Sequence, residues 1–160
     1  MEKKPLLSIA LLCSNRIDTV RRCLDSLMPI MEQLPSELIL LDTSTDPAVP
    51  PVLAEYTDNI TKFKWINDFS AARNVTVQQA KGEWYLYIDD DEWFEDVTVL
   101  VEFFKSGEYK KYGCANYIQR NFHDLDLTHY SDSWASRMIK LTPETHFESK
   151  IHEYMTPVPG

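Results

Sequence analysis

The sequence predicts an α/β fold with a mostly parallel sheet flanked by helices, of the Rossmann-like kind. Short apolar runs of strand length alternate with longer segments of helical periodicity. The runs are continuously apolar, which is typical of strands that are buried on both faces. Two of them stop abruptly at acidic or turn-forming residues, as strands do at the carboxyl edge of an open α/β sheet.

The first strand is expected over residues 6–13, and a helix follows it. Asp18 or Thr19 can cap this helix, and Pro29 should end or kink it. The apolar stripe of the helix consists of Val20, Cys23, Leu24, Leu27, Met28 and Met31. The side chains of this stripe are predicted to pack on the sheet.

The next elements repeat the alternation. A strand over residues 38–41 is followed by a helix near 52–57 and a short strand over 60–63. Ser70 can cap a further helix that Gly82 ends, and the aromatic and branched run 84–88 is a strong strand candidate.

The remaining elements are less regular. A helix over 97–105 precedes strands over 113–119 and 136–141, and a last short pattern surrounds Ile151. Alternating strands and helices imply right-handed crossovers and hence parallel neighbours in the sheet.

The chain is acidic, with 25 acidic and 16 basic residues and a formal net charge of -9. This charge repels a phosphate backbone, so no nucleic-acid partner is expected. A nucleotide ligand remains compatible with the charge, because a divalent cation held by carboxylates inverts the local potential.

Cysteines and hydropathy bear on where the protein works. Cys13, Cys23 and Cys114 form no closely spaced pair, which favours a reducing, cytoplasmic location. Since no run of about 18 apolar residues occurs, no transmembrane segment is expected. Peripheral association with the inner face of a membrane stays open.

Consecutive carboxylates, Asp89, Asp90, Asp91 and Glu92, follow the strand predicted over 84–88. They repel one another unless a positive charge offsets them, and their hard oxygens suit Mg²⁺ or Mn²⁺. The alternative is a solvated acidic turn at the start of the next helix. The position at a predicted strand end favours the metal site.

Three segments in order, residues 66–74, 79–84 and 89–92, resemble the family 2 glycosyltransferases, and the strand ends at 13–16 and 41–46 fit the same family. The resemblance implies a GT-A fold and inverting transfer of a sugar from a nucleotide-diphosphate donor. A UDP-sugar is the expected donor, and a saccharide or a lipid-linked molecule is the expected acceptor. Mn²⁺ or Mg²⁺ is the implied cofactor.

The resemblance also implies roles for particular residues. Asp89 and Asp91 would hold the metal, with Asp91 serving catalysis. Inversion needs a base on the opposite face of the sugar, for which Glu153 is the first candidate and His152 the second. The implied nucleotide-sugar site consists of Cys13, Ser14, Asn15, Asp42, Thr43, Arg73, Asp89 and Asp90.

Residues 1–160 are expected to form a single GT-A domain, with the nucleotide-binding half in 1–100 and the start of an acceptor half in 101–160. The chain is expected to be truncated at its C-terminal side. The main alternative is a non-catalytic or truncated nucleotide-sugar-binding domain. A nucleotidyltransferase is less favoured, because a glycine-rich phosphate loop is missing before Lys81.

Some side chains have a second interpretation. Arg73 could serve only as an ion-pair partner of Asp68 or another acidic neighbour. Trp93 and Trp134 are as well explained by an acceptor groove as by ordinary burial.

Overall fold

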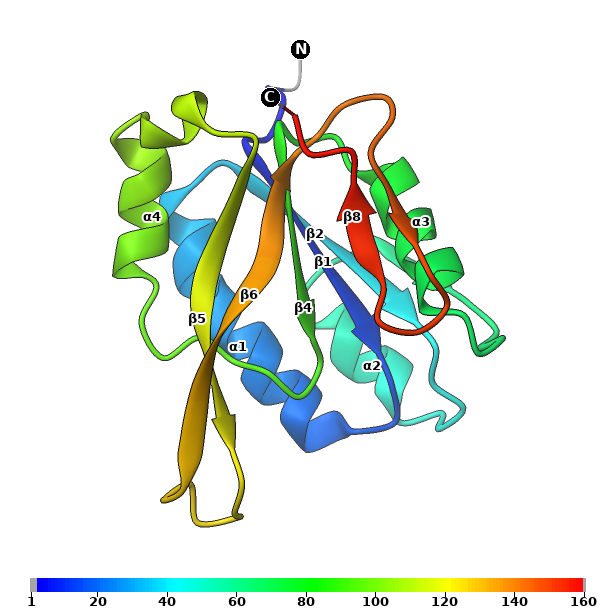
Figure 1. The fold of residues 1–160 in the computed structure, drawn as a ribbon. Coiled ribbons are helices and arrows are strands. Elements are labelled where there is room, and N and C mark those ends of the chain that lie inside the picture. The colour runs from blue at the N-terminus through cyan, green and yellow to red at the C-terminus, as the bar shows by residue number, and fades with distance from the viewer. Residues whose placement is uncertain (1–2, 160) are drawn as a thin grey trace.

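The computed structural model describes residues 3–159, and its main sheet has the strand order β3-β2-β1-β4-β6-β5 (Figure 1). Four neighbouring strands are parallel: β1 (Leu7–Cys13), β2 (Ser36–Asp42), β3 (Ile60–Lys62) and β4 (Trp84–Asp89). The sheet continues with two antiparallel strands, β6 (Tyr130–Lys140) beside β4 and β5 (Cys114–Phe122) beside β6. The expected mostly parallel α/β sheet is confirmed.

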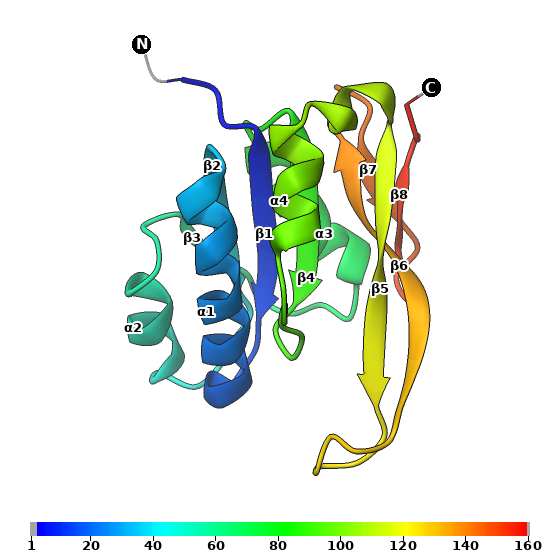
Figure 2. The same ribbon diagram turned by 90° about the vertical axis from the view of Figure 1, so that its left-hand side faces the viewer.

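Both faces of the sheet are covered. One face carries α1 (Ile17–Gln33), α2 (Val49–Ala54) and α4 (Thr98–Lys105), followed by the short 3-10 helix η1 (Glu108–Lys111). The other face carries α3 (Phe69–Gln79) and a hairpin of β7 (His146–Glu148) and β8 (Tyr154–Thr156). Figure 2 shows α1 and α2 on one side of β1 and the hairpin on the other. Because side chains of both faces are buried, the central strands are continuously apolar.

The helix starts differ from the expected ones. α1 begins at Ile17 after Arg16, and Thr19, which lies inside the first turn, donates its hydroxyl back to the Arg16 carbonyl at 3.1 Å. The helix does not end at Pro29 but continues to Gln33.

The cap of α3 is Asp68, whose carboxylate accepts the Ala71 amide at 3.0 Å, so the expected Ser70 cap is wrong. The Ser70 hydroxyl instead donates to the Ser149 carbonyl. α2 likewise begins and ends three residues earlier than expected, at Val49 and Ala54.

The second half of the chain departs most from expectation. β5 and β6 are longer than predicted and form a hairpin that extends beyond the rest of the molecule (Figure 1). β5 alternates exposed and partly buried residues, and the outer part of β6 is exposed throughout, so neither carries a continuous apolar run there. The β7–β8 hairpin was not expected, because each of its strands has only three residues.

Within residues 3–159, none of the helices combines the length and the apolar character needed to cross a membrane.

Candidate active site

The acidic segment begins at the carboxyl end of β4, next to the ends of β1 and β2. In the register, Leu12 lies beside Asp89, and Cys13 beside Asp42. The chain passes from β1 to β2 and β3 on one side of β1, and then to β4 on its other side. The carboxyl edge between β1 and β4 is therefore a topological switch point, which is where open α/β sheets bind ligands. The fold therefore brings the predicted site residues to one edge.

Asp89, Asp91 and Glu92 converge at this edge. One carboxylate oxygen from each lies within 4.8 Å of the others, which is the spacing of a group that can share a cation. The Asp91 side chain is 50% exposed, whereas Asp89 and Glu92 are partly buried. Oxygen donors of this kind are the ligands that Mg²⁺ and Mn²⁺ prefer. The chemistry of this donor set thus fits a divalent cation.

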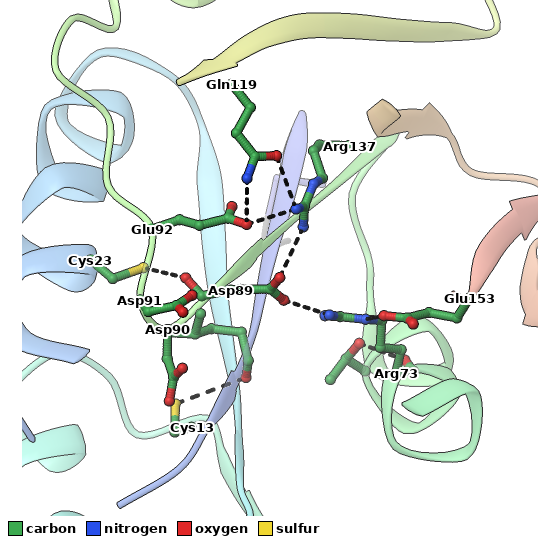
Figure 3. A network of polar contacts seen from close by, with 12 residues as sticks. Cys13, Cys23, Arg73, Asp89, Asp90, Asp91, Glu92, Gln119, Arg137 and Glu153 are labelled. Carbon is green, nitrogen blue, oxygen red and sulfur yellow. Dashed lines mark hydrogen bonds and ion pairs between the residues drawn. The ribbon is translucent and has the colours of Figure 1, made fainter. Parts of the chain in front are cut away.

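Two guanidinium groups flank Asp89 (Figure 3). Arg73 of α3, which is 3% exposed, donates from Nη2 to Asp89 Oδ1 at 2.6 Å. Arg137 of β6 places Nη1 3.6 Å from Asp89 Oδ2 and donates from Nη2 to Glu92 Oε1 at 2.7 Å. Both guanidiniums lie over the ring of Tyr87, at 4.5 and 4.7 Å from its centroid. Stacking and ion pairing together fix the Asp89 side chain.

The two partly buried carboxylates respond differently to this environment. Burial opposes ionisation of Asp89, but the charges of Arg73 and Arg137 outweigh it and hold the pKa of Asp89 below its usual value. Burial raises the pKa of Glu92 to about 7, and the neighbouring Asp89 charge adds to the effect although Arg137 opposes it. Near pH 7, the Glu92 carboxyl group is therefore protonated in about half of the molecules.

Glu153 approaches Asp89 from the side opposite Glu92 (Figure 3). Its Oε1 accepts a hydrogen bond from Arg73 Nε at 2.8 Å, so one guanidinium joins Glu153 to Asp89 (Figure 3). His152 is exposed and contributes none of the hydrogen bonds around Asp89 in the described chain. The ion pairs of Arg73 are thus made with Asp89 and Glu153, and the alternative pairing with Asp68 is wrong.

Asp90 points away from its two neighbours. It is 3% exposed and accepts hydrogen bonds from the Ser14 amide at 2.8 Å and the Ser14 hydroxyl at 2.6 Å. Arg16 pairs with Asp90 at 2.5 Å and with Asp91 at 3.1 Å. Asp90 therefore connects the acidic segment to the loop after β1.

The loops after β1 and β2 are joined as well. The Cys13 carbonyl accepts from both the amide and the hydroxyl of Thr43, each at 2.9 Å. Asn15 Oδ1 accepts the amides of Thr45 and Asp46 at 2.8 and 3.0 Å.

Asp42, at the end of β2, is buried and accepts the Ser44 amide at 2.9 Å and the Lys62 ammonium at 3.2 Å. The residues predicted to surround the nucleotide thus form one continuous wall.

A cavity of about 500 Å³ opens at Asp89, on the face of the sheet that carries β8. Asp89, Arg137 and Glu153 line it, and so does Trp134, which is 73% exposed. A second, more apolar cavity of about 480 Å³ lies between α4 and β5 and includes Trp93. Trp134, and not Trp93, therefore shares a cavity with the candidate base.

Sequence reasoning assigned no site role to Arg16, Tyr87 or Arg137. The signal for Arg137 was a single arginine inside a strand predicted to join the sheet, where an unpaired charge is costly and so indicates an acidic partner. Tyr87 gave no distinct signal, because an aromatic residue in a buried strand is expected on packing grounds alone.

A parallel sheet continued by antiparallel strands beyond β4, with carboxylates at the β4 end, defines a GT-A type glycosyltransferase fold. Two solved structures share it. S. aureus TarS, residues 1–349, has a TM-score of 0.53 and 20% identity, over 71% of this chain and 34% of that one. The mannosyltransferase PcManGT from Pyrobaculum calidifontis, solved with GDP-Man and Mn²⁺, has a TM-score of 0.53 and 16% identity, over 70% and 35%.

This chain belongs to glycosyl transferase family 2, whose sequence model matches residues 8–152. It is 30% identical over 155 residues to the SPbeta prophage-derived glycosyltransferase SunS of Bacillus subtilis (strain 168), across 93% of this chain and 34% of that protein. It is 26% identical over 154 residues to the putative glycosyltransferase EpsH of the same bacterium, across 93% and 43%. The chain therefore spans less than half the length of these curated relatives.

Proposed function

We propose that this chain binds a nucleotide-diphosphate sugar together with a divalent cation and transfers the sugar, with inversion, to an acceptor hydroxyl. The observation that carries the proposal is the convergence of Asp89, Asp91 and Glu92 at the ligand-binding edge of the sheet. Membership of family 2 supports the class of reaction.

The charge of the site supports a cation. Ion pairs join five carboxylates, Asp89, Asp90, Asp91, Glu92 and Glu153, to three guanidiniums, Arg16, Arg73 and Arg137. Two negative charges therefore remain when all five carboxylates are ionised, which matches one divalent ion. Asp89, Asp91 and Glu92 are the proposed ligands. When bound, Mn²⁺ or Mg²⁺ stabilises as a Lewis acid the charge that develops on the departing diphosphate.

The donor is proposed to lie along the wall formed by the loops after β1 and β2. Asp42 and Thr43 border the space for the base, and Cys13 and Asn15 hold that border in place, while Ser14 joins it to Asp90. Asp42 is buried and holds Lys62, whose exposed ammonium offers a donor for base recognition. UDP is the proposed nucleotide. The GDP-Man and Mn²⁺ complex of PcManGT supports the wider class of nucleotide sugars.

Glu153 is the proposed base. It lines the same cavity as Asp89, so an acceptor hydroxyl in that cavity can reach its carboxylate from the side opposite the donor wall. Arg73 orients Glu153 by its hydrogen bond. The exposed rings of Trp134 and Tyr154 flank the cavity and suit a saccharide acceptor, whose C–H faces pack on aromatic rings.

Calorimetric titration with UDP and GDP, with and without Mn²⁺, tests donor binding. Asp91→Ala removes an exposed ligand without disturbing the core, and Asp126→Ala, an exposed acid on the β5–β6 hairpin, is its matched control. We expect Mn²⁺-dependent binding by the wild type and Asp126→Ala, and at least a tenfold loss in Asp91→Ala, because removing even an outer partner of a metal ligand costs about 10–100-fold in metal affinity. Equal binding by all three proteins would exclude the carboxylate site.

Donor binding without turnover is the second candidate, because this chain covers only 34% and 43% of the two glycosyltransferases above. Hydrolysis of a bound UDP-sugar in the absence of acceptor distinguishes the two. Slow release of the free sugar that Glu153→Gln abolishes supports catalysis. Binding with no sugar release supports a nucleotide-sugar-binding role.

A further inference from the structure

The α3 helix presents a row of polar side chains to the β7–β8 hairpin. Arg73 and Asn74 follow Ser70 by three and four residues and so lie on the same side of the helix as Ser70. The Ser70 hydroxyl donates to the Ser149 carbonyl. Asn74 bonds the backbone of Phe147 twice, accepting its amide at 2.7 Å and donating to its carbonyl at 3.1 Å. We call Ser70, Arg73 and Asn74 the α3 row.

The turn between β7 and β8 has an unfavourable backbone. Ser149 has φ 74° and His152 has φ 55°, in the left-handed region that residues other than glycine seldom adopt. Such conformations persist only where surrounding contacts hold them, and they concentrate at functional sites. The start of α3 supplies those contacts, because the Phe69 amide donates to the Lys150 carbonyl at 3.1 Å and Ser70 holds Ser149.

The strained turn leads directly into Glu153. Arg73 bonds Glu153 at 2.8 Å and Asp89 at 2.6 Å, and both carboxylates line the 500 Å³ cavity. The position of the turn therefore sets the distance between the candidate base and the donor-site carboxylate. Ser70 and Asn74 touch neither carboxylate and act on that distance through the hairpin.

We propose that the α3 row positions the base: Ser70 and Asn74 hold the β7–β8 turn in its strained form, and Arg73 locks Glu153 against the donor site. Ser70 and Asn74 are thus positioning residues. The inference rests on the proposed function, because the role of Glu153 as the base is part of that proposal. It predicts that removing the contacts of Ser70 or Asn74 displaces Glu153 and leaves the nucleotide site intact.

Asn74→Ala tests the row, and Gln78→Ala, an exposed residue of the same helix, is the matched control. Native-state digestion with trypsin reports the turn, because Lys150 is exposed within it. Loss of the two Asn74 hydrogen bonds should raise cleavage after Lys150 about tenfold in Asn74→Ala, with no change in Gln78→Ala. Ser70→Ala provides a second variant if Asn74→Ala does not fold.

A spectroscopic readout separates base positioning from general stability. In protein labelled with ¹³C at the glutamate carboxyl carbon, bound Mn²⁺ should broaden the Glu153 signal in the wild type and Gln78→Ala. The broadening should decrease in Asn74→Ala, while the affinity for UDP with Mn²⁺ stays within about twofold, less than the effect of one hydrogen bond.

Three results would overturn the inference. Trypsin cleavage in Asn74→Ala equal to that of the control would show that the row does not hold the turn. Unchanged broadening of Glu153 would show that the turn does not place the base. A parallel loss of UDP affinity would show that the row supports the donor site instead. If the wild type binds neither UDP nor GDP, the proposed function fails and the base role with it, whereas the cleavage result still decides whether the row holds the turn.

Discussion

The raised pKa of Glu92 predicts that the proposed metal binding depends on pH within the neutral range. A carboxyl group must lose its proton before it can ligate a cation, so proton and metal compete for Glu92. With a pKa of about 7, roughly one in ten Glu92 side chains is ionised at pH 6 and nine in ten at pH 8. Mn²⁺ affinity should therefore be about tenfold weaker at pH 6 than at pH 8. Asp89, whose pKa is lowered, remains ionised throughout this range.

Titration calorimetry with Mn²⁺ at pH 6, 7 and 8 measures the effect, and Glu92→Gln is the control because it cannot ionise. At pH 7 the wild type should release about half a proton per Mn²⁺, seen as a dependence of the heat on the ionisation enthalpy of the buffer. The variant should bind more weakly, with little change between pH 6 and 8. Equal wild-type affinities at pH 6 and 8, or a tenfold change that persists in Glu92→Gln, would refute the reasoning.

Two further predictions concern the frame of the site. Asp90→Ala leaves the Ser14 amide without its acceptor and Arg16 without its closer partner. Urea unfolding should therefore show a free energy of unfolding lower by about 1–3 kcal/mol, with one Mn²⁺ still bound per chain. An unchanged stability together with loss of Mn²⁺ binding would assign Asp90 to the metal instead. Asp68→Ala removes the α3 cap and should cost about 1 kcal/mol in the same assay, and a loss below about 0.3 kcal/mol would show that the cap hydrogen bond does not contribute.

The parallel half of the fold was predictable because its strands are buried on both faces. Residues 84–88, for example, are all apolar or aromatic and occupy the middle of the sheet, so hydropathy alone reveals them. The β5–β6 hairpin was only partly predictable, since its outer half leaves the body of the molecule and loses the apolar signal. β7 and β8 are shorter than any window in which periodicity can be read.

The site was predictable where strand ends supply it and not where distant segments meet. Asp89 and Asp42 follow recognisable strands, so their placement at the carboxyl edge follows from the fold class. The partners of Arg73 did not follow, because Glu153 is 80 residues away and its approach depends on the unexpected hairpin. Asp89 and Asp90 have opposite orientations because neighbouring residues alternate at the end of a strand, so spacing could have separated their roles.

The segment after β2 is held by the loop after β1, whereas the charged groups around Asp89 are held by other contacts. The two regions should therefore tolerate substitutions independently. Asn15 and the Cys13 carbonyl hold the segment after Asp42 through its first few residues, whereas the guanidiniums around Asp89 rest on α3 and on the sheet itself. An engineer can therefore exchange the exposed residues Pro47 and Ala48, which precede the buried Val49 of α2, while Thr43 and Thr45 are kept as attachment points. The charged centre should survive such grafts, because none of its contacts passes through the exchanged segment.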